Sequence, residues 1–207
     1  MVVGMHKKES VIYPLFSMPL MAMSLEIDNN KILKFIKETD FRKNKSSDGC
    51  YVSKSMKLLE NKELKKEKNI FLTAIQEYVT AIGYSKKFKI LNSWGNKVLK
   101  NCQSHTHVHT NTWLSGVYYT QDNSSIAFKK NWAASSFFNL DHNRANNLYS
   151  AEEWKVTAKQ NTLLLFPSEM QHKVQKNILK TSRYSLSFVI NPVGTFNTGN
   201  DNQITYV

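Results

Sequence analysis

The stretch from residue 105 to residue 119, HTHVHTNTWLSGVYY, restricts the possible folds of this chain more than any other. An alternating apolar run follows from Trp113 to Tyr119, and side chains two residues apart on a β-strand point the same way. This run therefore predicts a strand. The same rule would place His105, His107 and His109 on one face at the entrance to that strand.

A group of histidines at a strand entrance indicates a metal site. Neutral imidazole is the commonest metal ligand in proteins, and the neighbouring strand would hold the rings on a rigid support. The residues of this stretch leave a second interpretation open, in which the histidines are only a surface feature.

The length of 207 residues fits one domain with a sizeable core, and the hydrophobic content of 41% indicates a globular protein. We expect a single domain over residues 1–207. Within it, residues 1–87 would form an N-terminal strand and helical support region, residues 88–192 the region that carries the chemistry, and residues 193–207 a C-terminal tail.

The chain is strongly basic, with 28 lysines and arginines against 16 acidic residues and a formal net charge of +12. Residues 1–100 carry 19 basic and 10 acidic residues, hence +9, and residues 101–207 carry 9 and 6, hence +3. Because most of the excess lies in a lysine-rich half away from the histidines, a nucleic-acid partner is not favoured.

Two cysteines, Cys50 and Cys102, do not form a disulfide framework, which favours a reduced, cytoplasmic compartment. Residues 7–23 start with a basic pair and continue as an apolar run, as a signal peptide does, but Pro14 and Pro19 interrupt the run. One or two strands over residues 11–27, at an edge of a sheet, are the preferred interpretation. No stretch is long enough to span a membrane, so no membrane partner is predicted.

Two helices are predicted in the first half of the chain. The first is capped by Asp28 and ends near Glu38, and the second covers about residues 61–82 with an apolar stripe on one side. Residues 40–56, with KNKSSDG at their centre, are expected to form a loop.

From residue 88 onward the pattern changes to short strands. They are expected at residues 88–98, 113–121, 126–129, 162–166, 183–190 and 204–207. Residues 122–125 would be the turn of a hairpin between the second and third of these, and residues 130–160, without a clear period, a functional loop. The predicted fold class is α+β with an antiparallel sandwich or barrel as its core.

A second group of residues strengthens the metal-site hypothesis. His172 stands a few residues beyond the apolar strand, and Arg183 opens the last long strand eleven residues later, with Ser185 on the same face.

At this point the sequence resembles a known family, the Fe(II)- and 2-oxoglutarate-dependent oxygenases, and within it a group found in bacteria and their tailed phages. The resemblance covers about residues 88–192. The shared motifs are NSWGN at 92–96, HVHTN at 107–111, LSGVYY at 114–119, LLLFPS at 163–168, HKV at 172–174 and RYSLSF at 183–188.

The resemblance implies a double-stranded β-helix, a jelly-roll with the N-terminal helices packed on one sheet and Fe(II) at its open end. His107 matches the first metal-binding histidine and His172 the distal one. Arg183, with Ser185 beside it and Tyr119 nearby, matches the residues that bind the far carboxylate of the co-substrate 2-oxoglutarate. The implied reaction uses dioxygen to hydroxylate a substrate that the sequence does not identify.

One position departs from the wider family, which has a carboxylate two residues after the first histidine. Here that residue is His109, so either His109 is the third ligand or a carboxylate arrives from elsewhere, with Asp122 the nearest in the chain. We expect His109 to ligate and His105 to lie beside the site or at the surface.

Two rival hypotheses remain at this stage: a metal-binding cupin-like module without redox chemistry, and a structural protein that retains the fold. Trp94 and Trp113 are expected to serve packing rather than to hold a substrate. The oligomeric state is not predicted.

Overall fold

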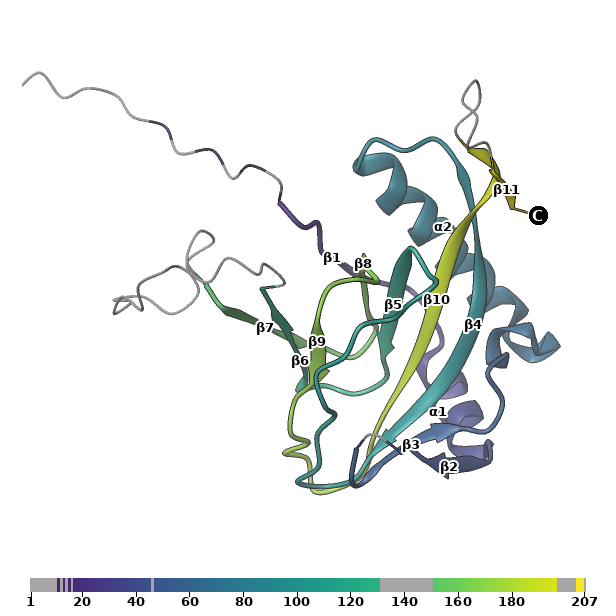
Figure 1. The fold of residues 1–207 in the computed structure, drawn as a ribbon. Helices are drawn as coiled ribbons and strands as arrows, with labels where there is room; N and C mark the ends of the chain where they lie inside the picture. Colours follow the sequence, from purple (N-terminus) through teal and green to yellow (C-terminus); the bar gives the residue numbers. More distant parts are fainter. Residues whose placement is uncertain are drawn as a thin grey trace, which may run out of the picture.

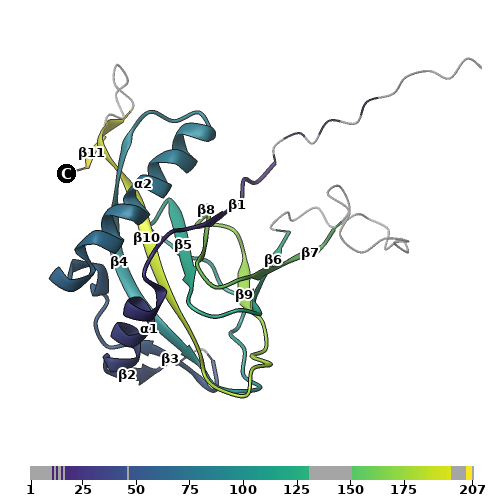
Figure 2. The same cartoon turned by 180° about the vertical axis from the view of Figure 1, so that it is seen from behind.

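The computed structural model describes residues 11, 13, 15, 17–45, 47–130, 151–196 and 204–206. Within them, two antiparallel sheets face each other and two helices cover the outer face of the larger sheet (Figures 1 and 2). This is the expected double-stranded β-helix. No helix in the described ranges is long and apolar enough to cross a membrane.

The large sheet has eight strands in the described residues, seven in one row and one that pairs with the end of β10. In spatial order they are β1 (Met21–Ser24), β8 (Thr162–Pro167), β5 (Leu114–Tyr119), β10 (Arg183–Phe196), β4 (Lys87–Val98), β3 (Cys50–Ser53) and β2 (Phe41–Lys43), with β11 (Ile204–Tyr206) beside β10. The small sheet is β7 (Glu153–Ala158), β6 (Ser124–Lys129) and β9 (His172–Val174).

Successive side chains of β10 alternate between two interior regions, one between the large sheet and the helices and one between the two sheets. Leu186, Phe188 and Ile190 are fully buried in a cluster with the helices, whereas the residues between them face the small sheet. A second cluster, which includes Phe128 and Phe166, fills part of the space between the sheets. The rest of that space is a cavity.

The helices form where the sequence predicts them. Helix α1 spans Asn29–Glu38, and the side chain of Asp28 accepts a hydrogen bond from the backbone N–H of Lys31 at 3.1 Å, which confirms the predicted cap. Helix α2 spans Lys65–Ala81 and begins later than predicted, because two short 3₁₀ turns, Leu58–Glu60 and Lys62–Leu64, precede it.

The prediction of a loop over residues 40–56 is wrong. Its ends form strands β2 and β3, which pair with each other and extend the large sheet beyond β4. Each strand has only three or four residues, too few to show a period, and β3 gains its order from β4, about 45 residues later in the chain.

The predicted hairpin between residues 113–121 and 126–129 is also wrong. Strand β5 already pairs with β8 on one edge and β10 on the other, so no edge is left for β6. Residues 120–123 instead carry the chain to the small sheet, where β6 pairs with β7 and β9.

Two further boundaries differ from the prediction. Strand β10 continues through Pro192 to Phe196, and Pro192 still lies opposite Phe88 of β4. Of the loop predicted at residues 130–160, residues 131–150 lie outside the described ranges, and the last part contains strand β7.

The close approach of β5 to its neighbour gives a stability prediction. A Cβ added to Gly116 would overlap ring carbons of Phe188, which is fully buried and packs on Phe71 with ring centroids 5.2 Å apart. We expect Gly116→Ala to lower the free energy of unfolding by about 1–3 kcal/mol, measured by urea denaturation. Adding Phe188→Leu should restore part of the loss, and an unchanged denaturation midpoint for Gly116→Ala would contradict this packing.

Candidate metal centre

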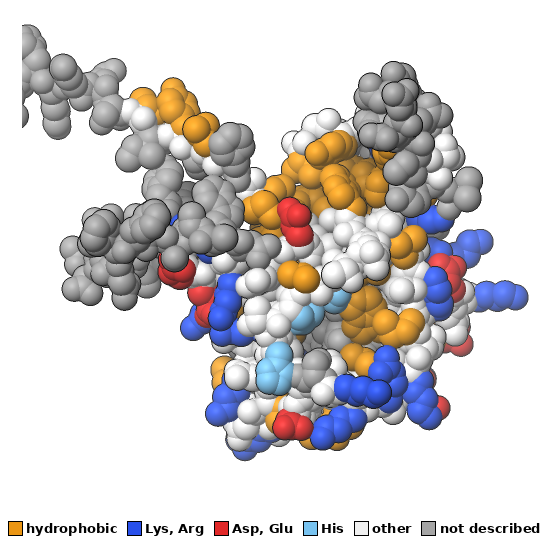
Figure 3. Space-filling model, in the orientation of Figure 1, with side chains coloured by type: hydrophobic (Ala, Val, Ile, Leu, Met, Phe, Trp, Pro, Cys, Tyr) orange, Lys and Arg blue, Asp and Glu red, His pale blue; other side chains and the backbone are white. Residues whose placement is uncertain are grey.

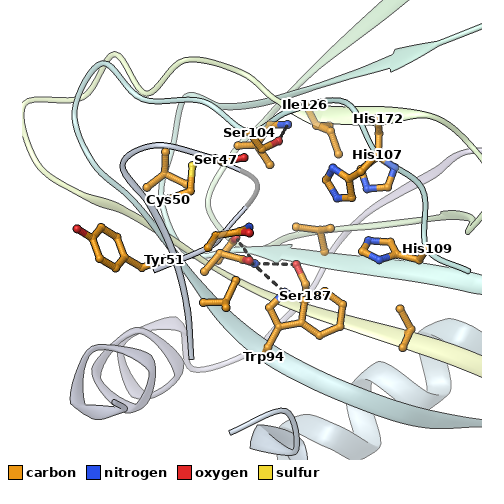
Figure 4. A pocket seen from close by; sticks show the side chains of 18 of the residues that line it. Ser47, Cys50, Tyr51, Trp94, Ser104, His107, His109, Ile126, His172 and Ser187 are labelled. Atoms are coloured by element: carbon orange, nitrogen blue, oxygen red, sulfur yellow. Dashed lines mark hydrogen bonds between the residues drawn. The ribbon is translucent and has the colours of Figure 1, made fainter. Parts of the chain in front are cut away.

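Three of the predicted histidines come together at one end of the cavity between the sheets. One ring nitrogen of each of His107, His109 and His172 lies within 4.8 Å of the others, and the described residues contain no other such group of three or more. The close-up view shows the three rings side by side (Figure 4). Two segments about 65 residues apart therefore meet at one point.

Backbone hydrogen bonds bring these segments together. His107 and His172 each donate a backbone N–H to the carbonyl of the other at 2.9 Å, and His109 donates to the carbonyl of Ser168 at 3.0 Å. The buried Ser168 also shares side-chain hydrogen bonds with Thr112 and Ser115. The histidines thus stand on a segment anchored at several points, as a metal site requires.

The hydrogen bonds of the rings set their tautomers. Nδ1 of His107 lies 2.9 Å from the carbonyl oxygen of His105, and Nδ1 of His172 lies 2.7 Å from that of Met170. Because a carbonyl oxygen only accepts, each Nδ1 must carry the proton. The Nε2 lone pair of both rings is then available to a cation, as in known metal sites.

The surroundings keep two of the rings neutral. Burial, with a smaller effect of the neighbouring His107, lowers the pKa of His172 to about 3 and that of His109 to about 4. The ring of Phe166 packs edge-on against His172 at 4.9 Å. At pH 7 both rings are in the form that binds a metal.

The other predicted candidates for the third ligand lie elsewhere. The His105 side chain is exposed and outside the group, and it contributes only its backbone carbonyl. Asp122 accepts a hydrogen bond from the backbone of Gln160 and does not line the cavity. In the described residues, the donor set is three imidazole nitrogens.

The cavity next to the histidines has a volume of about 490 Å³. Its wall is the inner face of the large sheet, where residues that pair directly across strands form rows. One row joins Tyr119 of β5, Ser185 of β10, Asn96 of β4, Val52 of β3 and Arg42 of β2. In the orientation of Figure 1, the space-filling view shows histidine side chains at the molecular surface, with hydrophobic and basic side chains near them (Figure 3).

No aspartate or glutamate is among the described residues that line this cavity, although it contains two of the three arginines of the chain, Arg42 and Arg183. The cavity therefore favours an anionic ligand.

Arg183 has an incomplete set of partners. Its side chain is 3% exposed, Nη2 donates to the carbonyl of Gln175 at 2.9 Å, and Nη1 has no hydrogen-bond partner. The buried hydroxyl of Tyr119 also lacks one. Burial lowers the pKa of Arg183 and raises that of Tyr119. An unpaired buried donor costs about 1–3 kcal/mol, so two in one cavity fit a bound acceptor group.

Several cavity residues were given no role in the sequence prediction. Ser187 follows Ser185 at the next inward position of β10, and Asn96 lies opposite Ser185. The alternation in RYSLSF predicts that Ser187 lies on the same face as Ser185, but no local pattern identifies Asn96 as a cavity residue. Trp94 lines the cavity, whereas Trp113 packs on Phe88 and Tyr84 outside it.

A further orphaned atom, Nε2 of Gln175, is buried without a partner, but Gln175 does not line the cavity. We assign it no role.

The fold and this site define a double-stranded β-helix protein with a group of three imidazoles that could hold a metal ion at one end of its cavity. Residues 92–189 match the family described as "Putative 2OG-Fe(II) oxygenase". The matched range contains the three histidines and Arg183. Residues 92–189 are thus similar to the 2OG-Fe(II) oxygenase family. No curated protein sequence matches it.

Solved structures share the fold at low sequence identity. HygX from Streptomyces hygroscopicus, with nickel and 2-oxoglutarate bound, is 10% identical, with a TM-score of 0.59 over 84% of this chain and 83% of the other. A prolyl-4-hydroxylase from Pseudomonas putida is 11% identical, with a TM-score of 0.57 over 87% and 96%. The epimerase SnoN from nogalamycin biosynthesis is 10% identical, with a TM-score of 0.59 over 91% and 89%.

Proposed function

We propose that this protein is an Fe(II)- and 2-oxoglutarate-dependent oxygenase that hydroxylates a C–H bond of its substrate. In the net reaction, substrate R–H, 2-oxoglutarate and dioxygen give R–OH, succinate and carbon dioxide. The observation that carries the proposal is the combination in one cavity of three imidazoles with a buried guanidinium that has an unpaired N–H.

The histidines fit iron. His107, His109 and His172 would hold Fe(II) through nitrogen, a ligand type that suits this ion, and three protein ligands leave coordination positions open. Iron bound here would supply the activation of dioxygen that hydroxylation of an unreactive C–H bond requires.

Arg183 and Tyr119 fit 2-oxoglutarate. The Nη1 of Arg183 and the hydroxyl of Tyr119 would donate to the far carboxylate, and Ser185 lies beside them on the same wall. The planar guanidinium, held by the carbonyl of Gln175, would fix the orientation of that carboxylate. The absence of acidic side chains from the described lining avoids repulsion of the dianion.

The apolar residues around His172 would keep water away from the metal end. Phe128 and Phe166 pack on each other and on the His172 ring, and Ile126 adds to the same wall. A dry wall strengthens the electrostatic interactions of the bound co-substrate.

The structural neighbours support the co-substrate more strongly than the final step. HygX was crystallised with iron and, separately, with nickel and 2-oxoglutarate. The neighbours also include both a prolyl-4-hydroxylase and an epimerase, so hydroxylation is the part of this proposal that the fold does not select.

Two measurements test the proposal. Anaerobic addition of Fe(II) and then 2-oxoglutarate should produce the weak visible charge-transfer band of the chelate, and exposure to air should yield succinate even without substrate. Zinc or nickel as the metal found after native purification, with no band and no succinate after loading with Fe(II), would instead support the non-redox cupin-like module and refute the oxygenase.

A further inference from the structure

Four side chains on the cavity wall are joined by hydrogen bonds. Nε1 of Trp94 donates to Oδ1 of Asn96 at 3.1 Å, and Nδ2 of Asn96 lies 3.2 Å from Oγ of Ser185 and 2.8 Å from Oγ of Ser187. Asn96 is directly opposite Ser185, and Trp94 is opposite Ser187. Figure 4 shows Trp94 and Ser187 on the strands of the large sheet, with the histidine rings across the cavity.

The indole of Trp94 determines the orientation of the Asn96 amide. An indole N–H can only donate, so the amide atom that it contacts must be the oxygen. The amide nitrogen then faces the two serines, and both of its hydrogens are used, one for each hydroxyl.

The same reasoning determines where the serine protons point. A hydroxyl has one proton to donate and lone pairs to accept with, and here both hydroxyls accept from Asn96. Ser185 and Ser187 line the cavity, and no other hydrogen bond of either hydroxyl occurs within the described residues. Each proton is therefore left to donate to a group inside the cavity.

The two serines mark different parts of the cavity. Ser185 is paired with Tyr119, whose hydroxyl lacks a partner, and stands two residues from Arg183. Ser187 is opposite Trp94, whose ring centroid lies 5.6 Å from that of His109. The line of donors therefore runs from Arg183 toward the metal end.

We propose that Asn96 is a positioning residue that holds the hydroxyls of Ser185 and Ser187 as donors to the oxygens of the bound α-keto acid. This inference rests on the proposed function, since it takes 2-oxoglutarate as the ligand. Ser185 donates to the far carboxylate beside Arg183, and Ser187 donates to an oxygen nearer the metal. Asn96 touches no reacting atom and acts only through the serines.

The test is Asn96→Asp in protein loaded with redox-inert Zn(II), with 2-oxoglutarate binding measured by calorimetry. The carboxylate of the variant can only accept, so both serine protons turn toward it and away from the ligand. We expect the dissociation constant of 2-oxoglutarate to rise at least tenfold, which corresponds to about 1.4 kcal/mol. Zn(II) should still bind, since the three histidines are unchanged.

A second comparison separates this effect from the added negative charge. In a protein that carries Ser185→Ala and Ser187→Ala, the serine protons are gone and Asn96→Asp adds only charge. Asn96→Asp should then weaken 2-oxoglutarate binding by a clearly smaller factor than in the wild-type background. The same factor in both backgrounds overturns the proposal.

The two proposals fail in distinguishable ways. Wild-type protein with Zn(II) that does not bind 2-oxoglutarate refutes the proposed function, whereas wild-type binding with an Asn96→Asp dissociation constant within threefold refutes only the role of Asn96. If Asn96→Asp does not fold, as judged by its thermal midpoint, Trp94→Phe removes the donor that orients the amide. We expect Trp94→Phe to weaken 2-oxoglutarate binding as well, and undiminished binding there overturns the proposal.

Discussion

Replacement of Arg183 by methionine is expected to weaken 2-oxoglutarate binding at least about 30-fold, because truncating one partner of a buried charge pair typically costs about 2–5 kcal/mol. The same variant should keep or raise the thermal midpoint of the ligand-free protein. In that state the guanidinium is buried, has an unpaired Nη1 and contacts no acidic side chain among the described residues. An apolar side chain of similar length removes this desolvation cost.

Calorimetry with the Zn(II)-loaded protein measures the first effect and differential scanning calorimetry of the metal-free protein the second. Lys97→Met is the matched control, since Lys97 lies on the neighbouring strand, outside the cavity lining, with its ammonium over the ring of Tyr51. It removes the same charge and should leave 2-oxoglutarate affinity within about twofold. A variant of Arg183 that binds normally would show that the co-substrate lies elsewhere.

His109→Ala and His172→Ala should each lower the affinity for Fe(II) or Zn(II) by more than about 100-fold. Loss of a group that only supports a metal ligand already lowers metal affinity by about 10–100-fold. His105→Ala is the matched control in the same segment. Only the backbone carbonyl of His105 contacts His107, so this variant should bind metal like the wild type.

Metal affinity of the three variants can be compared by competition with a chelating indicator at pH 7. The comparison bears on the position where this chain departs from the wider family. If His109→Ala binds metal as tightly as His105→Ala does, the group of three imidazoles is not the metal site. Equal losses for His109 and His172 would establish His109 in the place of the usual carboxylate.

The histidine at this position changes the charge at the site. Three neutral imidazoles leave the full double charge of the metal ion, where a carboxylate would remove one unit. The cavity lining has no acidic residue in its described part, and Arg183 adds a further positive charge. A dianionic co-substrate would offset the metal charge, so we expect the affinity for the co-substrate to depend strongly on the metal being present.

Much of this arrangement could be read from local patterns. A period of two divides the residues of β5 and β10 between two faces, so the alternation alone places Arg183 and Ser185 on one face. The cap at Asp28 is equally local, because it depends on a bond across three residues. The family resemblance added the pairing of His107 with His172.

Other features depend on contacts between distant segments, which no local pattern encodes. Strand β3 is ordered by pairing with β4, and β2 by pairing with β3. Strand β6 leaves β5 because both edges of β5 are occupied. The role inferred for Asn96 depends on Ser185 and Ser187, about 90 residues away.

Side-chain direction along a strand is thus a property of the residue order, since successive residues alternate whatever surrounds them. The choice of neighbouring strand, and with it the meeting of imidazoles, guanidinium and amide around one cavity, depends on long-range pairing and burial. Those contacts exist only once the two sheets have closed on each other.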